Sequence, residues 1–496
     1  MRQVLPLLLL ICSLGAGAQV PIVQRSALRV SSELPQSVDN SLSKYFPPLI
    51  DQKGGSCAQA SAIGYMYTYE MNRLLDRDAS ASPANRFSYQ YTYNFVNEGK
   101  DNGSLSWEGL SLATDNGVIT EEDWPESGPT SFKWATGYEK YLTAIHYRAR
   151  TFDRIPLEKW EDLPGLKQFL YNRGTNGSAG GLVVFSGYAG NWTINQYDGP
   201  SATGYHRLLT QLGTDGGHAL TIVGYDDLVE FTTPGGEVSK GAFIVVNTWG
   251  SYAHDRGRFY LPYWLYFNHS PKNLLSDFVT SVDPYYQEPQ IVFKVGVECD
   301  SRDDLSFQIG VAPNQTDMRP THQIQVSIAD HQGGDHPMQG AWWPNDIEFG
   351  FDFSKVVKLM DGYDHPAYFL TVSRNKRGSK EATVARLTGL SVYDYRQGPG
   401  NTKVHVFDME EARQEGTVDF HTGYNTYRLS SIPPKKTSFS PVEWISAQTK
   451  QPVSAPLVVR TASGKYAKIR LSDYDRAAGT IHIKYVYNPE GGRNLK

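Results

Sequence analysis

The fold is decided by residues 51–75, which read DQKGGSCAQASAIGYMYTYEMNRLL. Apolar or small residues recur after the cysteine in steps of 3 and 4 and predict a helix from Cys57 to Leu75 whose buried face holds Ala60, Ile63, Tyr67, Met71 and Leu74. The thiol of Cys57 would then lie at the N-terminus of this helix, where exposed N–H groups favour the thiolate. The glycines before it let the backbone approach a substrate, and Gln52 can offer an amide N–H to a developing oxyanion. On this context alone, a catalytic thiol and a buried core cysteine are equally good interpretations.

Two polar residues lie at the ends of predicted strands further along the chain. His218 follows two glycines and opens a strand that runs to Val223, where its imidazole could act as a general base. Asn247 ends a strand that begins at Ala242 and could fix the tautomer of that imidazole, while Trp249 shields their hydrogen bond from water. Taken singly, each is more often structural, as a buried histidine or an ordinary turn asparagine.

Five segments in this order resemble the papain family of cysteine peptidases. They are LPQSVD at 34–39, the stretch 51–61, DNGSLSW at 101–107, Gly217-His218-Ala219 with Val223-Gly224-Tyr225, and Asn247-Thr248-Trp249-Gly250. The resemblance covers roughly residues 33–284, about half of the chain. It implies an α+β fold of two subdomains, one with a central helix and the other with a β-barrel-like sheet.

The resemblance also implies a role for each matching residue. Cys57 would be the nucleophile, and His218 the base that later protonates the leaving amine. Asn247 would orient His218, and Gln52 would form the oxyanion hole with the backbone N–H of Cys57. The substrate-binding residues would be Gly103 and Ser104, which would pair with an extended peptide, and Trp249, which would cover the His–Asn pair.

The chain departs from the family pattern at several places near these residues. Gln52 precedes Cys57 by five residues instead of six, and the family's second cysteine is replaced by Gly54. Ala58 stands where the family has an aromatic residue after the nucleophile, and Ser104 stands where the family has a glycine. The Trp-Gly pair that follows the Asn block is replaced by Ala253-His254, which would reshape the side of the site where the leaving group departs.

The composition is that of a globular protein of several domains. The 496 residues are 40 % hydrophobic and 20 % charged, and the net charge of −5 argues against a dedicated nucleic-acid binder. Met1 to Ala18 has an arginine, an apolar run and an Ala-Gly-Ala end, which predicts a signal peptide cut after Ala18 and a secreted, periplasmic or cell-surface protein. Of the three cysteines, Cys12 lies in that segment, and Cys57 and Cys299 remain. Two cysteines alone cannot form a framework of several disulfides. Cys299 is expected to be a buried strand residue.

The second half changes character near residue 290. Short alternating segments at 291–295, 347–351 and 368–372, separated by Gly, Pro, Asn and Asp, predict an all-β sandwich. The predicted domains are therefore a signal peptide at 1–18, a papain-like domain at 19–286, a β-sandwich at 287–397 and a small β-rich domain at 398–496.

The function that these features favour is a secreted cysteine endopeptidase acting on protein or peptide substrates, without metal or cofactor. A second hypothesis is an inactive papain-like protein that serves as a surface binding or adhesion module, as the altered Gln–Cys spacing and Ala58 suggest. A third keeps the chemistry but acts on a non-protein amide, such as a conjugated bile acid or a cell-wall peptide. The β-rich half would bind a glycan or a cell-surface ligand, and neither a nucleic-acid partner nor a transmembrane segment is expected.

Overall fold

The computed structural model describes residues 33–125, 132–175, 178–270, 273, 276, 278–330, 333–342, 344–374 and 385–407. It also gives the backbone of five further strands, at 23–24, 424–430, 457–460, 466–475 and 480–488. The predicted signal peptide at 1–18 lies outside the described residues. Within them, no helix is both long and apolar enough to cross a membrane.

The predicted helix from Cys57 to Leu75 is confirmed, but it is not a uniform α-helix. It consists of α1 (Cys57–Gln59), a π-helical segment η2 (Ala60–Tyr67) and α2 (Thr68–Leu75). In the π-segment the N–H of Thr68 reaches back five residues to the carbonyl of Ile63. The expectation of a single buried face is wrong, because every residue of η2 is buried, whereas Leu74 is 45 % exposed. A helix that is buried on all sides belongs at the centre of a domain.

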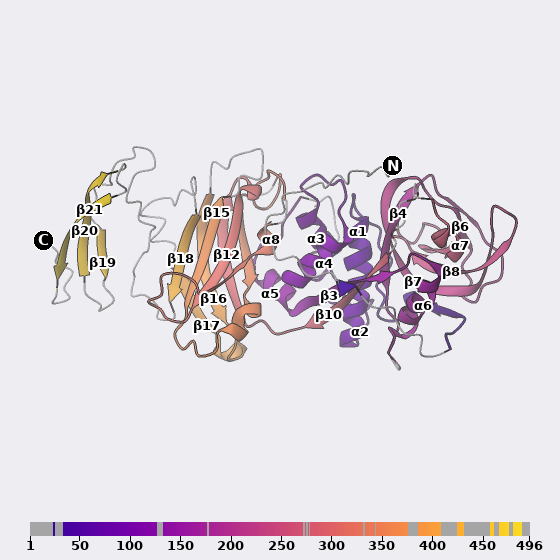
Figure 1. Cartoon of the computed structure of the whole chain (residues 1–496), viewed down its shortest axis with the longest axis horizontal. Helices are drawn as coiled ribbons and strands as arrows, with labels where there is room; N and C mark the ends of the chain where they lie inside the picture. The colour runs from indigo at the N-terminus through magenta and orange to yellow at the C-terminus, as the bar shows by residue number, and fades with distance from the viewer. Residues whose placement is uncertain are drawn as a thin grey trace, which may run out of the picture.

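The other helices surround this central one or connect strands. The helices α3, α4 and α5 lie on one side of it, with the strands β4, β7 and β8 on the other (Figure 1). The remaining α-helices are α3 (Tyr89–Val96), α4 (Ser106–Asp115), α5 (Tyr138–His146), α6 (Leu163–Asn172), α7 (Tyr263–Phe267) and α8 (Ser327–Asp330). The 3-10 turns are η1 (Asn40–Leu42), η3 (Pro83–Asn85), η4 (Trp160–Asp162), η6 (Arg302–Asp304), η7 (Ser354–Leu359) and η8 (Pro399–Asn401).

A ten-stranded sheet carries the rest of the first half. Its order is β1-β3-β10-β4-β7-β8-β9-β6-β5, and β2 pairs with β7 off this path. Among the described strands the path is open and ends at β1 and β5, and the barrel-like form of the sheet that the resemblance implies stays a prediction. The strands are β1 (Val23–Gln24), β2 (Ser37–Asp39), β3 (Tyr147–Pro156), β4 (Val183–Gly190), β5 (Thr193–Gln196), β6 (Arg207–Gln211), β7 (Asp215–Thr232), β8 (Val238–Val246), β9 (Arg258–Pro262) and β10 (Phe278–Tyr286).

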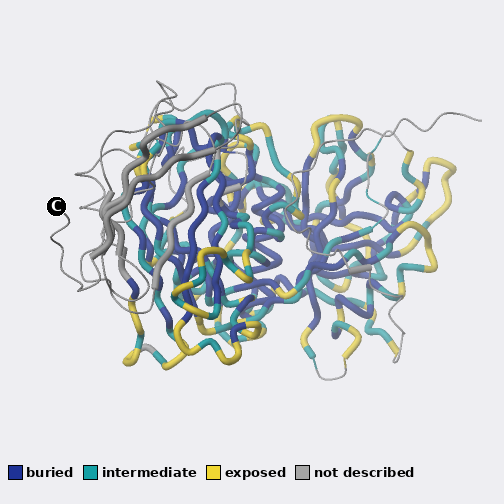
Figure 2. Tube along the Cα trace, turned by 60° about the vertical axis from the view of Figure 1, so that its left-hand side comes forward, coloured by how far each residue is buried: buried dark blue, intermediate teal, exposed yellow. Residues whose placement is uncertain are grey.

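Two four-stranded antiparallel sheets follow, and their inner faces pack through aromatic rings such as Phe307 against Phe351, 5.5 Å apart. The buried residues continue through both sheets and the helices (Figure 2). One sheet has the order β14 (Asp346–Asp352), β11 (Ile291–Cys299), β16 (Ala385–Asp394) and β17 (Lys403–Phe407). The other has the order β13 (His322–Gln325), β12 (Leu305–Ala312), β15 (Ala367–Arg374) and β18 (Tyr424–Ser430).

The predicted division of the chain into domains stays a prediction, but one boundary falls at an unexpected place. Residue 398 precedes β17 and β18, which pair with β16 and β15 of the two sheets. Beyond them, β19 (Leu457–Arg460), β20 (Tyr466–Asp475) and β21 (Thr480–Asn488) form a separate antiparallel sheet. Cys299 is fully buried at the end of β11, in agreement with its predicted place in a strand.

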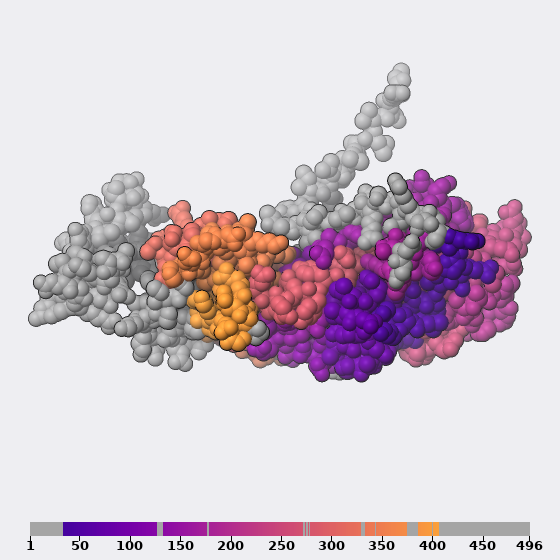
Figure 3. Space-filling model, turned by 90° about the horizontal axis from the view of Figure 1, so that it is seen from below, coloured from indigo at the N-terminus to yellow at the C-terminus, as the bar shows by residue number. Residues whose placement is uncertain are grey.

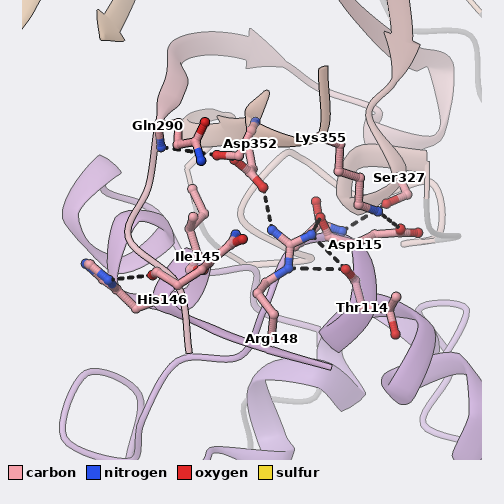
Figure 4. A network of polar contacts seen from close by, with 12 residues as sticks. Thr114, Asp115, Ile145, His146, Arg148, Gln290, Ser327, Asp352 and Lys355 are labelled. Carbon is pink, nitrogen blue, oxygen red and sulfur yellow. Dashed lines mark hydrogen bonds and ion pairs between the residues drawn. The ribbon is translucent and has the colours of Figure 1, made fainter. Parts of the chain in front are cut away.

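Buried contacts join the two halves of the described chain. The guanidinium of Arg148 in β3 donates to the carboxylate of Asp352 in β14 at 2.5 Å, and neither side chain is more than 2 % exposed (Figure 4). Arg148 also donates to the carbonyls of Thr114 and Asp115 at the end of α4. Seen from below, the helical part and the two sheets form one continuous surface (Figure 3).

Candidate active site

Cys57 is the first residue of α1, and its thiol is only partly accessible. The nearby backbone N–H groups of Ala219, Ala58 and Cys57 itself lower the pKa of the thiol, in the direction that a position at a helix N-terminus predicts. Burial is the larger effect, however, and it raises the pKa of the Cys57 thiol above its ordinary value of 9.0. At neutral pH the thiol therefore keeps its proton, and its use as a nucleophile requires a base.

His218 lies in β7 and is 7 % exposed. Its Nε2 is 2.8 Å from Oδ1 of Asn247, which is fully buried directly after β8. The indole of Trp249 stacks on the imidazole with ring centroids 4.9 Å apart. Burial lowers the pKa of His218 below 6.5, so that the imidazole is neutral at pH 7 and able to accept a proton.

The hydrogen-bond donors around Asn247 fix which nitrogen of His218 carries the proton. The backbone N–H of Thr248 can only donate, and it lies 2.7 Å from Oδ1 of Asn247. That atom is therefore the amide oxygen, and Nε2 of His218 must be its second donor. A neutral imidazole with its proton on Nε2 has its acceptor lone pair on Nδ1.

The structure places Cys57 beside the start of the strand that carries His218. The sulfur lies at the N–H of Ala219, the residue that follows His218. One turn further along the helix, the hydroxyl of Ser61 donates to the carbonyl of the same Ala219 at 3.0 Å. No hydrogen bond between Cys57 and His218 is present in the part of the chain that the structure describes, so any proton transfer between them requires a closer approach.

Gln52 is attached to the segment that follows Asn247. Its backbone N–H donates to the carbonyl of Thr248 at 2.7 Å, and its side-chain oxygen accepts from the hydroxyl of Thr248. One hydrogen of its amide nitrogen goes to the carbonyl of Gly54 at 3.0 Å. The second hydrogen of that nitrogen is the one that could serve an oxyanion, despite the shortened spacing to Cys57.

Gly103 and Ser104 lie against the loop before Cys57, in a segment that belongs to no strand. A Cβ on Gly55 would come within 2.7 Å of the backbone nitrogen of Gly103, so the two backbones touch. Gln59 in α1 donates to the hydroxyl of Ser104 at 3.1 Å and to the carbonyl of Leu105 at 2.9 Å. The helix that carries the thiol thus also holds the segment in which peptide binding was predicted.

Several residues contact this site although the sequence does not predict that they do. Trp192, from the turn between β4 and β5, has its ring 6.2 Å from that of His218 and 5.4 Å from that of Trp249. The hydroxyl of Tyr65 donates to the carbonyl of Asn247 at 3.1 Å. His254 accepts from the amide of Asn247. Of these residues, only His254 is indicated by the sequence, because Ala253-His254 departs from the family pattern near the site. A single Trp or Tyr far from the motifs gives no indication in the sequence that it lies at the site.

No group of three or more His, Cys, Asp or Glu side chains within the described ranges is arranged to hold a metal ion. The polar groups around Cys57 include the amide of Gln52, the imidazole of His218 and backbone N–H groups, and the pKa of Tyr93 also responds to the nearby Cys57. Such groups can orient a carbonyl, move a proton and stabilise an oxyanion.

Comparison with solved structures gives matches to cysteine proteases, whereas no family model and no curated protein matches the sequence. Xylellain, a cysteine protease from Xylella fastidiosa, is 21 % identical over 53 % of this chain and 91 % of its own, with a TM-score of 0.36. Procathepsin B S9 from Trypanosoma congolense is 14 % identical over 54 % of this chain and 83 % of its own, with a TM-score of 0.36. Bromelain from Ananas comosus, in complex with the E64 inhibitor, is 14 % identical over 50 % of this chain and 99 % of its own, with a TM-score of 0.35. At such identities and TM-scores the assignment of residues rests on the geometry above.

Proposed function

We propose that this protein is a cysteine endopeptidase that hydrolyses peptide bonds through an acyl-enzyme on Cys57. The observation that carries the proposal is the chain of hydrogen bonds at Asn247. The N–H of Thr248 identifies Oδ1 of Asn247 as the amide oxygen, and this oxygen accepts from Nε2–H of His218. Nδ1 of His218 is therefore left as a base, and the next residue, Ala219, has its backbone N–H near the sulfur of Cys57. Any buried imidazole N–H needs an acceptor, but here the acceptor also fixes the tautomer that leaves Nδ1 free to take a proton.

In the proposed reaction, Nδ1 of His218 takes the proton of Cys57 as the sulfur attacks the carbonyl carbon of the peptide. The oxyanion would accept from the second amide hydrogen of Gln52 and from the N–H of Cys57. His218 then gives the proton to the leaving amine, and a water molecule hydrolyses the thioester with the same base. Export behind a cut after Ala18 and a ligand for the β-rich half stay predictions.

A substrate library tests this function against the other two hypotheses. The purified chain is incubated with a mixture of peptides, with glycine-conjugated bile acids and with cell-wall peptides, and the products are identified by mass spectrometry. Cleavage inside the peptides supports the endopeptidase. Hydrolysis confined to the other amides assigns the chemistry to a different substrate, and no hydrolysis at all, with the protein folded, supports the binding module.

The acid side of the activity profile gives a second test. Because only neutral His218 can accept the thiol proton and burial lowers its pKa, kcat/KM is expected to fall with decreasing pH at a midpoint below 6.5. The sign follows from protonation, since an imidazolium has no acceptor lone pair. The rate would be measured from about pH 4 to about pH 8. A midpoint at or above 6.5 would contradict the assignment of the base.

A further inference from the structure

His254 lies in the turn between β8 and β9, in a backbone conformation that rarely suits a side chain. Its φ is +55°, in the left-handed region, and Arg256 of the same turn has a φ of +50°. A glycine adopts this conformation without strain, whereas other residues do so at a cost that tends to be kept where a side chain is needed. The strained backbone at His254 therefore indicates that its imidazole makes a contact that a glycine could not make.

The imidazole of His254 contacts the far end of the Asn247 amide. Nε2 of His254 lies 2.9 Å from Nδ2 of Asn247. Because the N–H of Thr248 identifies the other end of this amide as the oxygen, Nδ2 is an NH₂ group and can only donate. Nε2 of His254 must then be the acceptor, which requires a neutral imidazole with its proton on Nδ1. Asn247 is fully buried, so its NH₂ group needs this partner.

The surroundings of His254 keep it in that state. Its ring lies among those of Trp192, Phe259 and Trp249, at centroid distances of 5.8, 5.1 and 6.0 Å. Burial lowers the pKa of His254 to about 4, with smaller contributions from the charge of Arg207 and from the neighbouring His218. Near neutral pH the imidazole is therefore an acceptor and not a cation.

We propose that His254 is a positioning residue that holds the amide of Asn247 from behind and so keeps the base nitrogen of His218 directed to the nucleophile. This inference rests on the proposed function of the site. In this relay, His254 Nε2 accepts from Asn247, Asn247 Oδ1 accepts from His218, and only Nδ1 of His218 is left for the proton of Cys57. Among the described residues, no contact joins His254 to the sulfur of Cys57, so its effect on the nucleophile would pass through Asn247.

The first test replaces the side chain without disturbing the backbone. His254→Gly suits the left-handed φ and removes the acceptor, and we expect kcat to fall by about 10- to 100-fold with little change in KM. Arg256→Gly is the matched control, because it relieves the same kind of backbone strain in the same turn but removes no contact with Asn247. Unchanged kcat in His254→Gly, or an equal loss in Arg256→Gly, would overturn the proposal.

A second pair of variants keeps the test decisive if the glycine variant does not fold. His254→Gln and His254→Leu have side chains of similar size and the same backbone strain, but only glutamine offers an acceptor to Asn247. The proposal predicts that His254→Gln retains most of kcat and that His254→Leu loses as much as expected for glycine. Equal activity in these two variants would contradict it.

A spectroscopic measurement separates failure of this inference from failure of the proposed function. In the ¹⁵N-edited NMR spectrum of the full chain, His218 should show a proton on Nε2, and this signal should weaken or exchange rapidly in His254→Leu and His254→Gly. The readout needs no substrate, so it applies even if the protein cleaves nothing. An unchanged Nε2–H signal would show that His254 does not position the pair.

Discussion

Replacement of Cys57 by serine is expected to lower kcat/KM for any peptide substrate by at least about 10⁴-fold. A hydroxyl is far less acidic than a thiol, and His218, whose pKa is lowered by burial, is too weak a base to activate it. Cys299→Ser is the matched control, because Cys299 is the other described cysteine and is fully buried in β11. Its substitution should leave the activity of the folded protein intact.

The combination with His218→Ala sharpens this test. Residues that act as one unit in catalysis are strongly non-additive. The double variant should therefore be no less active than Cys57→Ser alone, and any residual hydrolysis should be the same in both. Full activity in Cys57→Ser, or loss of activity in folded Cys299→Ser, would disprove the proposed nucleophile.

The largest effect on stability is expected from Arg148→Ala. Removal of the guanidinium leaves the carbonyls of Thr114 and Asp115 without this donor (Figure 4). The buried carboxylate of Asp352 loses its cation and keeps only the neutral donors of Ser354. Loss of one partner of a buried ion pair costs about 3 to 5 kcal/mol. Because the pair joins β3 to β14, unfolding followed by urea should show the loss in both halves of the chain.

Two further variants distinguish the buried pair from an ordinary surface contact. Lys355→Ala removes the neighbouring pair with Asp115, in which Lys355 is 50 % exposed, and should cost no more than about 1 kcal/mol. The double variant Arg148→Met with Asp352→Leu removes both charges and should recover most of the loss. If Arg148→Ala were no more destabilising than Lys355→Ala, the buried contact would not hold the two halves together.

The sequence predicts where local elements such as helices lie better than it predicts which of their residues are buried. Spacing of apolar residues predicts the helix 57–75 because neighbours in the chain determine it. The same spacing cannot predict the π-turn or the burial of all sides, since both depend on contacts such as that of Gly64 with Ile50, whose Cδ1 would lie 2.4 Å from an added Cβ. Burial of the cysteine likewise reverses the pKa shift that the helix terminus alone predicts.

Short motifs in the sequence indicate the candidate residues, and their roles in catalysis stay predictions. The hydrogen bond between His218 and Asn247, predicted from two strand ends, is present in the structure. The sequence does not indicate that strands pair across residue 398, because partners such as β15 and β18 are more than 50 residues apart. Trp192 and Tyr65 reach the site only through the fold.

The central claim, a reactive thiol at Cys57 activated by His218, is tested most directly by labelling with a thiol-directed epoxide and locating the label by mass spectrometry. The account predicts one label per chain, on Cys57, and its loss in His218→Ala, while a general alkylating reagent still reacts with Cys57 in that variant. After unfolding, Cys57 and Cys299 should react alike. Labelling of Cys57 and Cys299 at equal rates in the folded protein, or labelling of Cys57 that does not depend on His218, would contradict the account.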